Sequence, residues 1–112
     1  MNFSQNGMAK DKGEIMLNSK QRANLRSLAS NYDSMVMIGK DGLTDTVLAQ
    51  IDRELYAREL VKVSVLDGAD LSAKQYLQEA CEKLKATQVC SIGRKFVLYR
   101  LSNKQGIKHI EY

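Results

Sequence analysis

The apolar positions of the chain first recur with the period of a helix. Between residues 17 and 32, the apolar side chains are spaced by three or four positions, as Leu25, Leu28, Ala29 and Tyr32. This spacing places them on one face of an amphipathic helix. Ser19 is the predicted N-cap, and Leu17 can pack back onto the helix from the preceding turn.

Two later segments have the same helical period. Thr44 can cap a helix that ends near Arg58 and whose apolar face consists of Val47, Leu48, Ile51 and Leu55. Ser72 and Gln75 have the spacing of a capping box at the start of a further helix. The apolar stripe of that helix is the most complete in the chain and consists of Ala73, Tyr76, Leu77, Ala80, Cys81 and Leu84.

The remaining apolar runs have the pattern of β-strands. Residues 35–38 form a short run that ends in glycine, which favours a buried strand. In LVKVSVL, residues 60–66, valines alternate with Lys62 and Ser64, as in a strand with one buried face. QVCSIGRKFVLYRL predicts a hairpin whose turn, Gly93-Arg94, suits type II′ because glycine takes the first position.

The predicted order is α-β-α-β-α-β-β, which belongs to the α/β (α+β) class. We expect a two-layer arrangement with a four-stranded mixed sheet, in which each β-α-β passage crosses over right-handed. Helices with single apolar stripes can cover one face of the sheet. The other face, or the edge of the last strand, would then be more open to a partner.

Length and composition indicate one domain without a membrane segment. A chain of 112 residues with 44% apolar content can bury one modest core. We expect a flexible leader at residues 1–16, a domain at 17–102 and a polar, basic tail at 103–112. Because the chain has no long apolar run and no secretory signal, a cytoplasmic protein with no membrane association is predicted. A small single module is most simply a monomer.

Charge is distributed unevenly along the chain. Residues 1–40 carry six basic and three acidic side chains, residues 41–82 carry four and nine, and residues 83–112 carry seven and one. If the fold brings the two basic ends together, they form one positive surface for a polyanion while the acidic helices face solvent elsewhere.

Motifs for catalysis, cofactors or metals are missing from the sequence. It contains no phosphate-binding P-loop, no HExxH, and only one histidine, His109, which we interpret as a tail residue without a defined partner. Cys81 and Cys90 are predicted to be reduced and structural, since their spacing suits neither a disulfide framework nor a zinc site. The prediction is a non-enzyme with no cofactor.

GKDG, residues 39–42, lies where a predicted strand runs into a predicted helix. Glycines let a backbone approach closely, the helix N-terminus favours an anion, and Lys40 adds a mobile positive charge. Asp41 and Asp45 flank the same dipole and oppose a second anion. A structural turn with a solvated lysine is the simpler interpretation of this loop taken alone.

Four ordered motifs add context to this loop. LNSKQRANLRSLA, IGKDGLT, ELVKVSVL and IGRKFVLYR together resemble the CRM domain (chloroplast RNA splicing and ribosome maturation) over roughly residues 17–101, and specifically its small bacterial YhbY-type members. The resemblance implies RNA binding, association with precursor large ribosomal subunits and their ribosomal RNA, and a fold similar to the C-terminal domain of translation initiation factor three.

The resemblance also implies which residues contact RNA. The family's loop falls on Gly39, Lys40 and Gly42, its basic first helix on Lys20, Arg22 and Arg26, and its strand-end basic residues on Arg94 and Arg100. Lys95 adjoins Arg94 at the predicted hairpin tip, where both could contact RNA or only protect a sheet edge. An Arg100–Tyr99 pair could stack on bases, although packing is favoured for Tyr99.

Two departures from the family concern turns. Asp33-Ser34 stands where members often have proline, and Ala86-Thr87-Gln88 where they often have a glycine.

A protein-interaction adaptor that uses the open sheet face or edge strand remains the alternative function.

Overall fold

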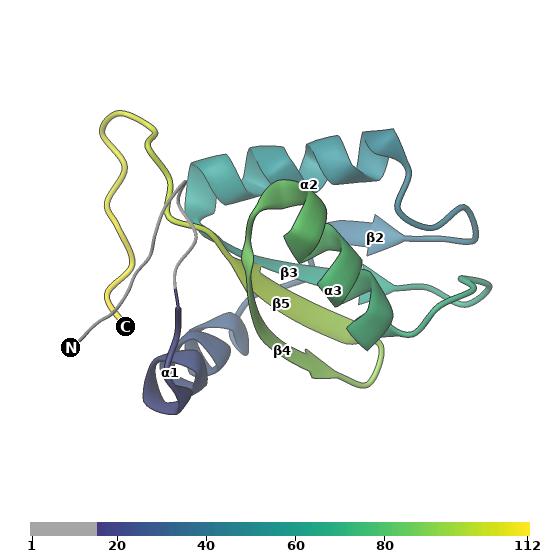
Figure 1. Ribbon diagram of the computed structural model, residues 1–112, viewed down its shortest axis with the longest axis horizontal. Helices are drawn as coiled ribbons and strands as arrows, with labels where there is room; N and C mark the ends of the chain where they lie inside the picture. The colour runs from purple at the N-terminus through teal and green to yellow at the C-terminus, as the bar shows by residue number, and fades with distance from the viewer. Residues whose placement is uncertain (1–15) are drawn as a thin grey trace.

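The computed structural model describes residues 16–112, so the predicted leader lies almost entirely outside the described residues (Figure 1). The helices are α1 (Ser19–Ala29), α2 (Asp45–Arg58) and α3 (Ala73–Leu84), and the strands are β2 (Val36–Ile38), β3 (Leu60–Val65), β4 (Thr87–Ile92) and β5 (Lys95–Tyr99). The sheet has the order β2-β3-β5-β4, in which β2 and β3 are parallel and the other pairs antiparallel. The predicted α+β class, element order and four-stranded mixed sheet are confirmed.

The larger core lies between the sheet and helices α2 and α3. Val61, Val63 and Val65 of β3 face this core, as their alternation predicts. Ile51 and Leu55 of α2 pack there without exposure, because both lie on the predicted apolar face of the helix. The complete stripe of α3 joins the same core, and its last member, Leu84, packs there while half-buried.

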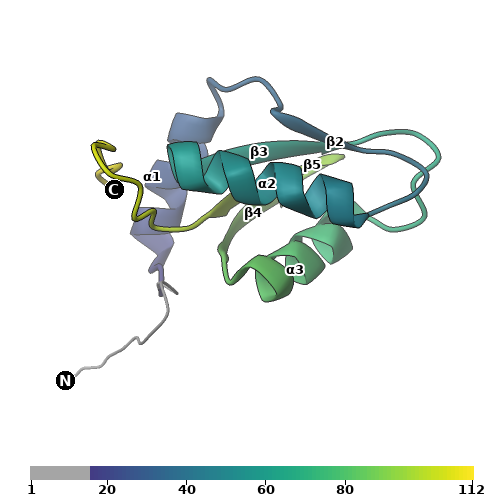
Figure 2. The same cartoon turned by 90° about the horizontal axis from the view of Figure 1, so that it is seen from above.

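Helix α1 lies on the opposite face of the sheet, which the expected two-layer arrangement left open (Figure 2). Its Leu25 and Ala29 pack on Leu60, Val89, Val97 and Tyr99 in a second, smaller core. The reason is the hairpin, whose strands present apolar side chains to both faces and so require cover on each. Leu28, predicted as part of the α1 stripe, is 40% exposed because the narrow contact uses only the Leu25–Ala29 edge.

Side chains at the helix N-termini fix where the helices begin. Asn18, rather than the predicted Ser19, caps α1, because its side chain accepts from the backbone N–H of Gln21 at 2.8 Å while Gln21 returns a bond to Asn18. The caps predicted at Thr44 and Ser72 are confirmed by bonds from the backbone N–H groups three residues on.

The segment after β5 folds back over the second core. Ile110 and Tyr112 pack against that core, and the ring of Tyr112 meets Tyr99 edge-on at 5.1 Å between centroids. His109, interpreted from sequence as having no partner, lies 2.6 Å from a carboxylate oxygen of Glu59. That interpretation was wrong because Glu59, at the end of α2, is buried and accepts bonds from this returning segment.

Candidate nucleic-acid interface

The glycine loop lies at one end of the sheet, beside two other turns (Figure 1). Leu66, just after β3, donates its N–H to Ile38 O at 2.8 Å, which holds the segment after β3 next to the loop. A Cβ on Gly68 would lie only 3.8 Å from the Cβ of Lys40, so the two turns are packed together. The β4–β5 turn joins them through a 2.7 Å bond from Val65 N–H to Arg94 O.

The two glycines of the loop differ in their structural roles. Gly42 has φ of +71°, donates its N–H to Gly39 O at 3.0 Å, and would bring a Cβ to 3.4 Å from the Tyr76 hydroxyl. A side chain at this position is therefore strained and crowded. A Cβ on Gly39 would meet nothing within 4 Å, so that glycine leaves space open to solvent.

Lys40 projects from this loop as a free cation. It is exposed, and within residues 16–112 its ammonium makes no hydrogen bond or ion pair. Asp45 occupies the first turn of α2 and already complements the helix dipole. An anion at this loop would consequently depend on Lys40 and the backbone rather than on the dipole.

The hairpin turn contributes two basic side chains with different surroundings. Gly93 has φ of +57° while Arg94 does not have positive φ, as a type II′ turn requires at these two positions. Arg94 forms a 2.5 Å ion pair with Asp67, but both side chains are mostly exposed, so the pair contributes little to stability. Lys95 is exposed and has no such partner within the described chain.

Helix α1 carries three basic residues and no acidic one: Lys20, Arg22 and Arg26. All three are exposed. Arg22 bonds Gln88 O at 3.4 Å and Leu17 O at 3.3 Å, which ties the start of α1 to the start of β4. Strands β4 and β5 also lack acidic residues. This side of the molecule therefore combines five basic side chains from α1 and the hairpin, and none of α1, β4 and β5 carries a carboxylate.

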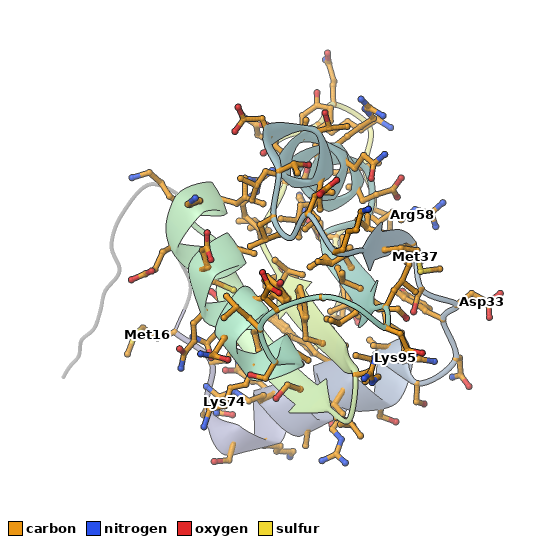
Figure 3. The ribbon with its side chains drawn as sticks, turned by 90° about the vertical axis from the view of Figure 1, so that its right-hand side faces the viewer. Met16, Asp33, Met37, Arg58, Lys74 and Lys95 are labelled. Atoms are coloured by element: carbon orange, nitrogen blue, oxygen red, sulfur yellow. The ribbon has the colours of Figure 1, made fainter. Side chains whose placement is uncertain are left out.

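The sheet beneath α1 is covered only in part. Strand register aligns one row of side chains near the loop end across all four strands: Met37, Ser64, Lys95 and Ile92. Met37 is 49% and Ile92 53% exposed, so α1 leaves this row open. Figure 3, viewed onto the loop end, shows Met37 and Lys95 on this side of the molecule and Lys74 of α3 on the other.

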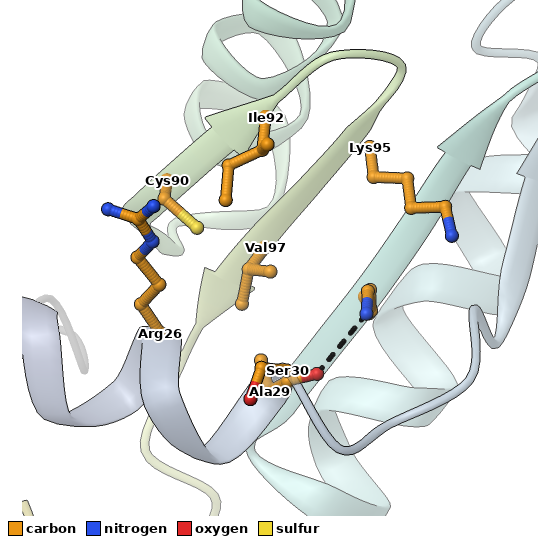
Figure 4. Close-up of a pocket in the computed structure, with 8 residues that line it drawn as sticks. Arg26, Ala29, Ser30, Cys90, Ile92, Lys95 and Val97 are labelled. Atoms are coloured by element: carbon orange, nitrogen blue, oxygen red, sulfur yellow. Dashed lines mark hydrogen bonds between the residues drawn. The ribbon is translucent and has the colours of Figure 1, made fainter.

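A groove of about 290 Å³ lies between the end of α1 and this open row (Figure 4). Three cationic side chains line it, namely Arg26, Lys62 and Lys95, together with the apolar surface of Ala29, Val97, Ile92 and the Cys90 thiol. Arg26 and Lys95 were predicted as contact residues from separate motifs. The structure places them at one groove, because α1 packs on the hairpin that carries Lys95.

Lys62 is the basic residue of the groove that sequence reasoning did not select. Its alternation with valines indicated a strand residue that points away from the larger core. The sheet face on that side is the one that α1 covers. There its ammonium donates to Tyr32 O at 3.0 Å and Ala29 O at 3.4 Å, which caps the C-terminal carbonyls of α1. The groove thus holds the positive charge of the Lys62 ammonium in a position that is fixed by two backbone carbonyls.

Cys90 is half-buried in this groove, and the pKa of its thiol depends on burial and on the charges nearby. Burial raises the pKa of Cys90, while the charges of Arg26 and Lys62 oppose that shift. Cys81 lies within the larger core, where burial raises its pKa to about 12. Both cysteines are free thiols.

Arg100 lies apart from these residues, on the side of α2 and α3. Its guanidinium donates to Asp52 Oδ1 at 2.8 Å and Leu84 O at 2.9 Å, and its side chain is 19% exposed. Tyr99 points to the opposite face and is buried, so packing, the favoured interpretation, is confirmed for it. No Arg100–Tyr99 pair is presented to solvent.

Metal and membrane features do not occur among residues 16–112. In this range no three His, Cys, Asp or Glu side chains gather as ligands for an ion. No helix of the same range combines the length and apolar character needed to cross a bilayer.

These features define a class of protein. Its members are small α+β domains that have a glycine loop at a strand–helix junction and a basic side formed by α1 and the hairpin. The family model of the CRS1/YhbY (CRM) domain matches residues 17–100. An "RNA-binding protein" of Haemophilus influenzae is 43% identical over 93 residues, which is 82% of this chain and 93% of that protein. A "Probable RNA-binding protein YqeI" of Bacillus subtilis is 37% identical over 80% of this chain and 96% of its own.

Solved structures agree with this relationship. A Staphylococcus aureus protein proposed to bind RNA, solved in solution, superimposes with a TM-score of 0.69 and is 39% identical over 80% of this chain and 94% of that one. The present chain therefore belongs to the CRS1/YhbY (CRM) domain family, as the four ordered motifs predict.

Proposed function

We propose that this protein is a non-catalytic RNA-binding protein that binds ribosomal RNA in precursor large ribosomal subunits and assists their assembly in the cytoplasm. The RNA-binding names of its relatives support the first part of this proposal. The observation that carries it in the structure is the α1–hairpin side, where five basic side chains have no acidic neighbour on their own elements. The acidic residues of α2 and α3 lie across the sheet.

The proposed contact surface runs from α1 over the groove to the loop end. It consists of Lys20, Arg22, Arg26, Arg94 and Lys95 with the loop residues Gly39, Lys40 and Gly42. Strand spacing separates the strand that leads into the loop, β2, from β5 by about 10 Å, so both can contact one RNA backbone. We leave Arg100 out, because its guanidinium is already used by Asp52 and Leu84 O on the other side.

Binding of this kind should depend strongly on salt. Each phosphate contact releases counterions, so losing one contact reduces the slope of log affinity against log salt by about one unit. Lys40→Glu should weaken binding to precursor large-subunit RNA and reduce this slope, while the domain stays folded because Lys40 is exposed and its ammonium makes no hydrogen bond or ion pair within residues 16–112. Lys74→Glu on α3 is the matched control, since Lys74 is exposed and is not one of the residues of the proposed contact surface. Equal affinity of the folded Lys40→Glu protein and the control would remove the loop from the surface.

Sedimentation of the tagged protein from a lysate tests the assembly role. Co-migration with precursor large subunits at low salt, and release at high salt, is the expected result. Protein that stays at the top of both gradients would refute the ribosomal assignment.

The second candidate function is a protein-interaction adaptor. It is favoured by the exposed apolar side chains of Met37 and Ile92 on the open row of the sheet. An adaptor would bind in a manner insensitive to salt and to the Lys40→Glu change, so the same titrations separate it from RNA binding.

A further inference from the structure

The groove beside α1 combines an apolar floor with a cationic rim. Its floor is apolar, formed by Val97, Ile92 and the half-buried Cys90. Its rim is cationic, formed by Arg26, Lys62 and Lys95, and no carboxylate lines it. Figure 4 shows the Arg26 and Lys95 side chains on opposite sides of Val97.

The charges of this rim are available to a ligand. Within residues 16–112, the guanidinium of Arg26 and the ammonium of Lys95 make no hydrogen bond or ion pair. Lys62 uses two backbone carbonyls, which fixes its ammonium in place without neutralising it. An anion at this position would meet a positive field that is already organised.

Size restricts the occupant. A volume of about 290 Å³ is at the lower limit of small-ligand pockets, which hold roughly 300–1,000 Å³. A helix or strand of a partner protein needs a longer groove, whereas one nucleobase with its sugar fits this scale. An unpaired nucleotide also supplies an apolar face and an adjacent phosphate, which complement the floor and the rim.

We propose that this groove binds one unpaired nucleotide of the RNA, with the base on the Ile92–Val97 floor and its phosphate between Arg26, Lys62 and Lys95. This proposal rests on the proposed RNA-binding function and adds to it a preference for RNA that offers an unstacked base. In this proposal, the open part of the sheet contacts the base, and the glycine loop contacts the sugar-phosphate backbone of the RNA.

Two RNA hairpins test the preference. One is fully paired, and the other is identical except for a single bulged nucleotide. Stacking of a base on an aromatic side chain changes affinity by about fivefold or more, and contact with this aliphatic floor should contribute less, so the bulged hairpin should bind the full-length protein about two- to fivefold tighter at equal salt.

Variants then locate the preference. Ile92→Ser removes apolar surface at a 53% exposed position, where folding tolerates the change. It should abolish the difference between the two hairpins while leaving affinity for the paired one unchanged. Leu71→Ser is the matched control, because Leu71 is 39% exposed, precedes α3 and does not line the groove. Lys95→Gln should weaken both hairpins, and the bulged one more.

The Cys90 thiol provides a direct readout of occupancy. Its alkylation by iodoacetamide at about pH 8.5 should be slowed severalfold by saturating bulged hairpin and less by the paired one. Cys81, enclosed in the larger core, is the internal control and should react slowly in every case.

The outcomes separate this proposal from the general function. Tight, salt-dependent binding of both hairpins with equal affinity, and an unchanged Cys90 rate, would overturn the nucleotide site while RNA binding stands. Binding of neither hairpin would overturn both, and the open row would then be assigned to a protein partner. A bulge preference that survives Ile92→Ser would also overturn the proposal, because the base would be recognised elsewhere.

Discussion

Replacing Glu59 should show how much the returning C-terminal segment contributes to the fold. Glu59 is fully buried, and its carboxylate accepts from Ser102 N–H at 2.8 Å, Ile110 N–H at 3.1 Å and the His109 ring at 2.6 Å. Glu59→Ala removes the acceptor that the backbone N–H groups of Ser102 and Ile110 use within residues 16–112. The result should be a large loss of stability without loss of α1, α2 or α3.

The size of the loss follows from these bonds. A buried donor left without a partner costs about 1–3 kcal/mol, so two donors would cost about 2–6 kcal/mol. Detachment of the segment would let water reach Ile110 N–H and lower the upper figure. We therefore expect about 2–5 kcal/mol. His109 is 53% exposed, and its share is small because solvent screens it.

Backbone geometry at this position supplies a control. Glu59 has φ of +71° although it is not glycine. Glu59→Gly loses the same carboxylate as Glu59→Ala but relieves the backbone, which should recover about 1 kcal/mol. A Gly variant less stable than the Ala variant would contradict this account of the turn after α2.

Acid should weaken the same interaction. Burial would raise the pKa of Glu59, but the bonds from Ser102, His109 and Ile110 and the charge of His109 outweigh it, so the pKa is lowered from 4.5. A lowered folded-state pKa means that this stabilisation is complete above the ordinary pKa and is lost as pH falls through the folded value. The stability difference between the native protein and Glu59→Gln should stay constant near neutral pH and shrink below about pH 4.

Urea unfolding followed by circular dichroism measures these differences, since the chain has no tryptophan. The ring signals of Tyr99 and Tyr112 report separately whether the segment remains docked. A loss below about 1 kcal/mol for Glu59→Ala, with the tyrosine contact retained, would refute the reasoning, because the two N–H groups would then have other partners.

Two further predictions concern the larger core and its edge. Leu77→Ala should lower the free energy of unfolding by about 2–5 kcal/mol, because Leu77 is 2% exposed. Urea titration measures this loss. A loss under about 1 kcal/mol would show that the site collapses around the smaller side chain. Arg100→Gln should destabilise the junction of α2, α3 and β5 by about 1–2 kcal/mol through the bonds to Asp52 and Leu84 O. It should leave the salt slope of RNA binding unchanged, and a slope reduced by about one unit would return Arg100 to the contact surface.

Local patterns were sufficient to predict most of the fold. The alternation of Val61, Val63 and Val65 correctly predicted which side of β3 is buried. The stripe of α3 and its Ser72–Gln75 capping box were likewise determined by neighbouring residues alone. These signals are strong because period and capping depend on positions at most four apart.

The side of the sheet that a helix covers was not predictable in this way. The stripe of α1 shows that it packs on something, but its position over β4 and β5 depends on residues more than 60 positions later. For that reason Lys62 was interpreted as a simple outward residue, and the groove that it shares with Arg26 and Lys95 was missed. His109 was missed for the same reason, since its partner Glu59 is 50 positions away.

The returning segment also changes what counts as the folding unit. The family match ends at residue 100, and a chain cut there would retain every helix and strand of the domain. It would nevertheless deprive the Glu59 carboxylate of its donors from Ser102 and Ile110 and remove the segment that covers it. We expect that shortened chain to admit water into the smaller core around Tyr99. Residues 101–112 lie beyond the matched family model, yet they complete the packing of the smaller core and the hydrogen bonding of Glu59, so a chain that ends at residue 100 should be less stable than the whole chain.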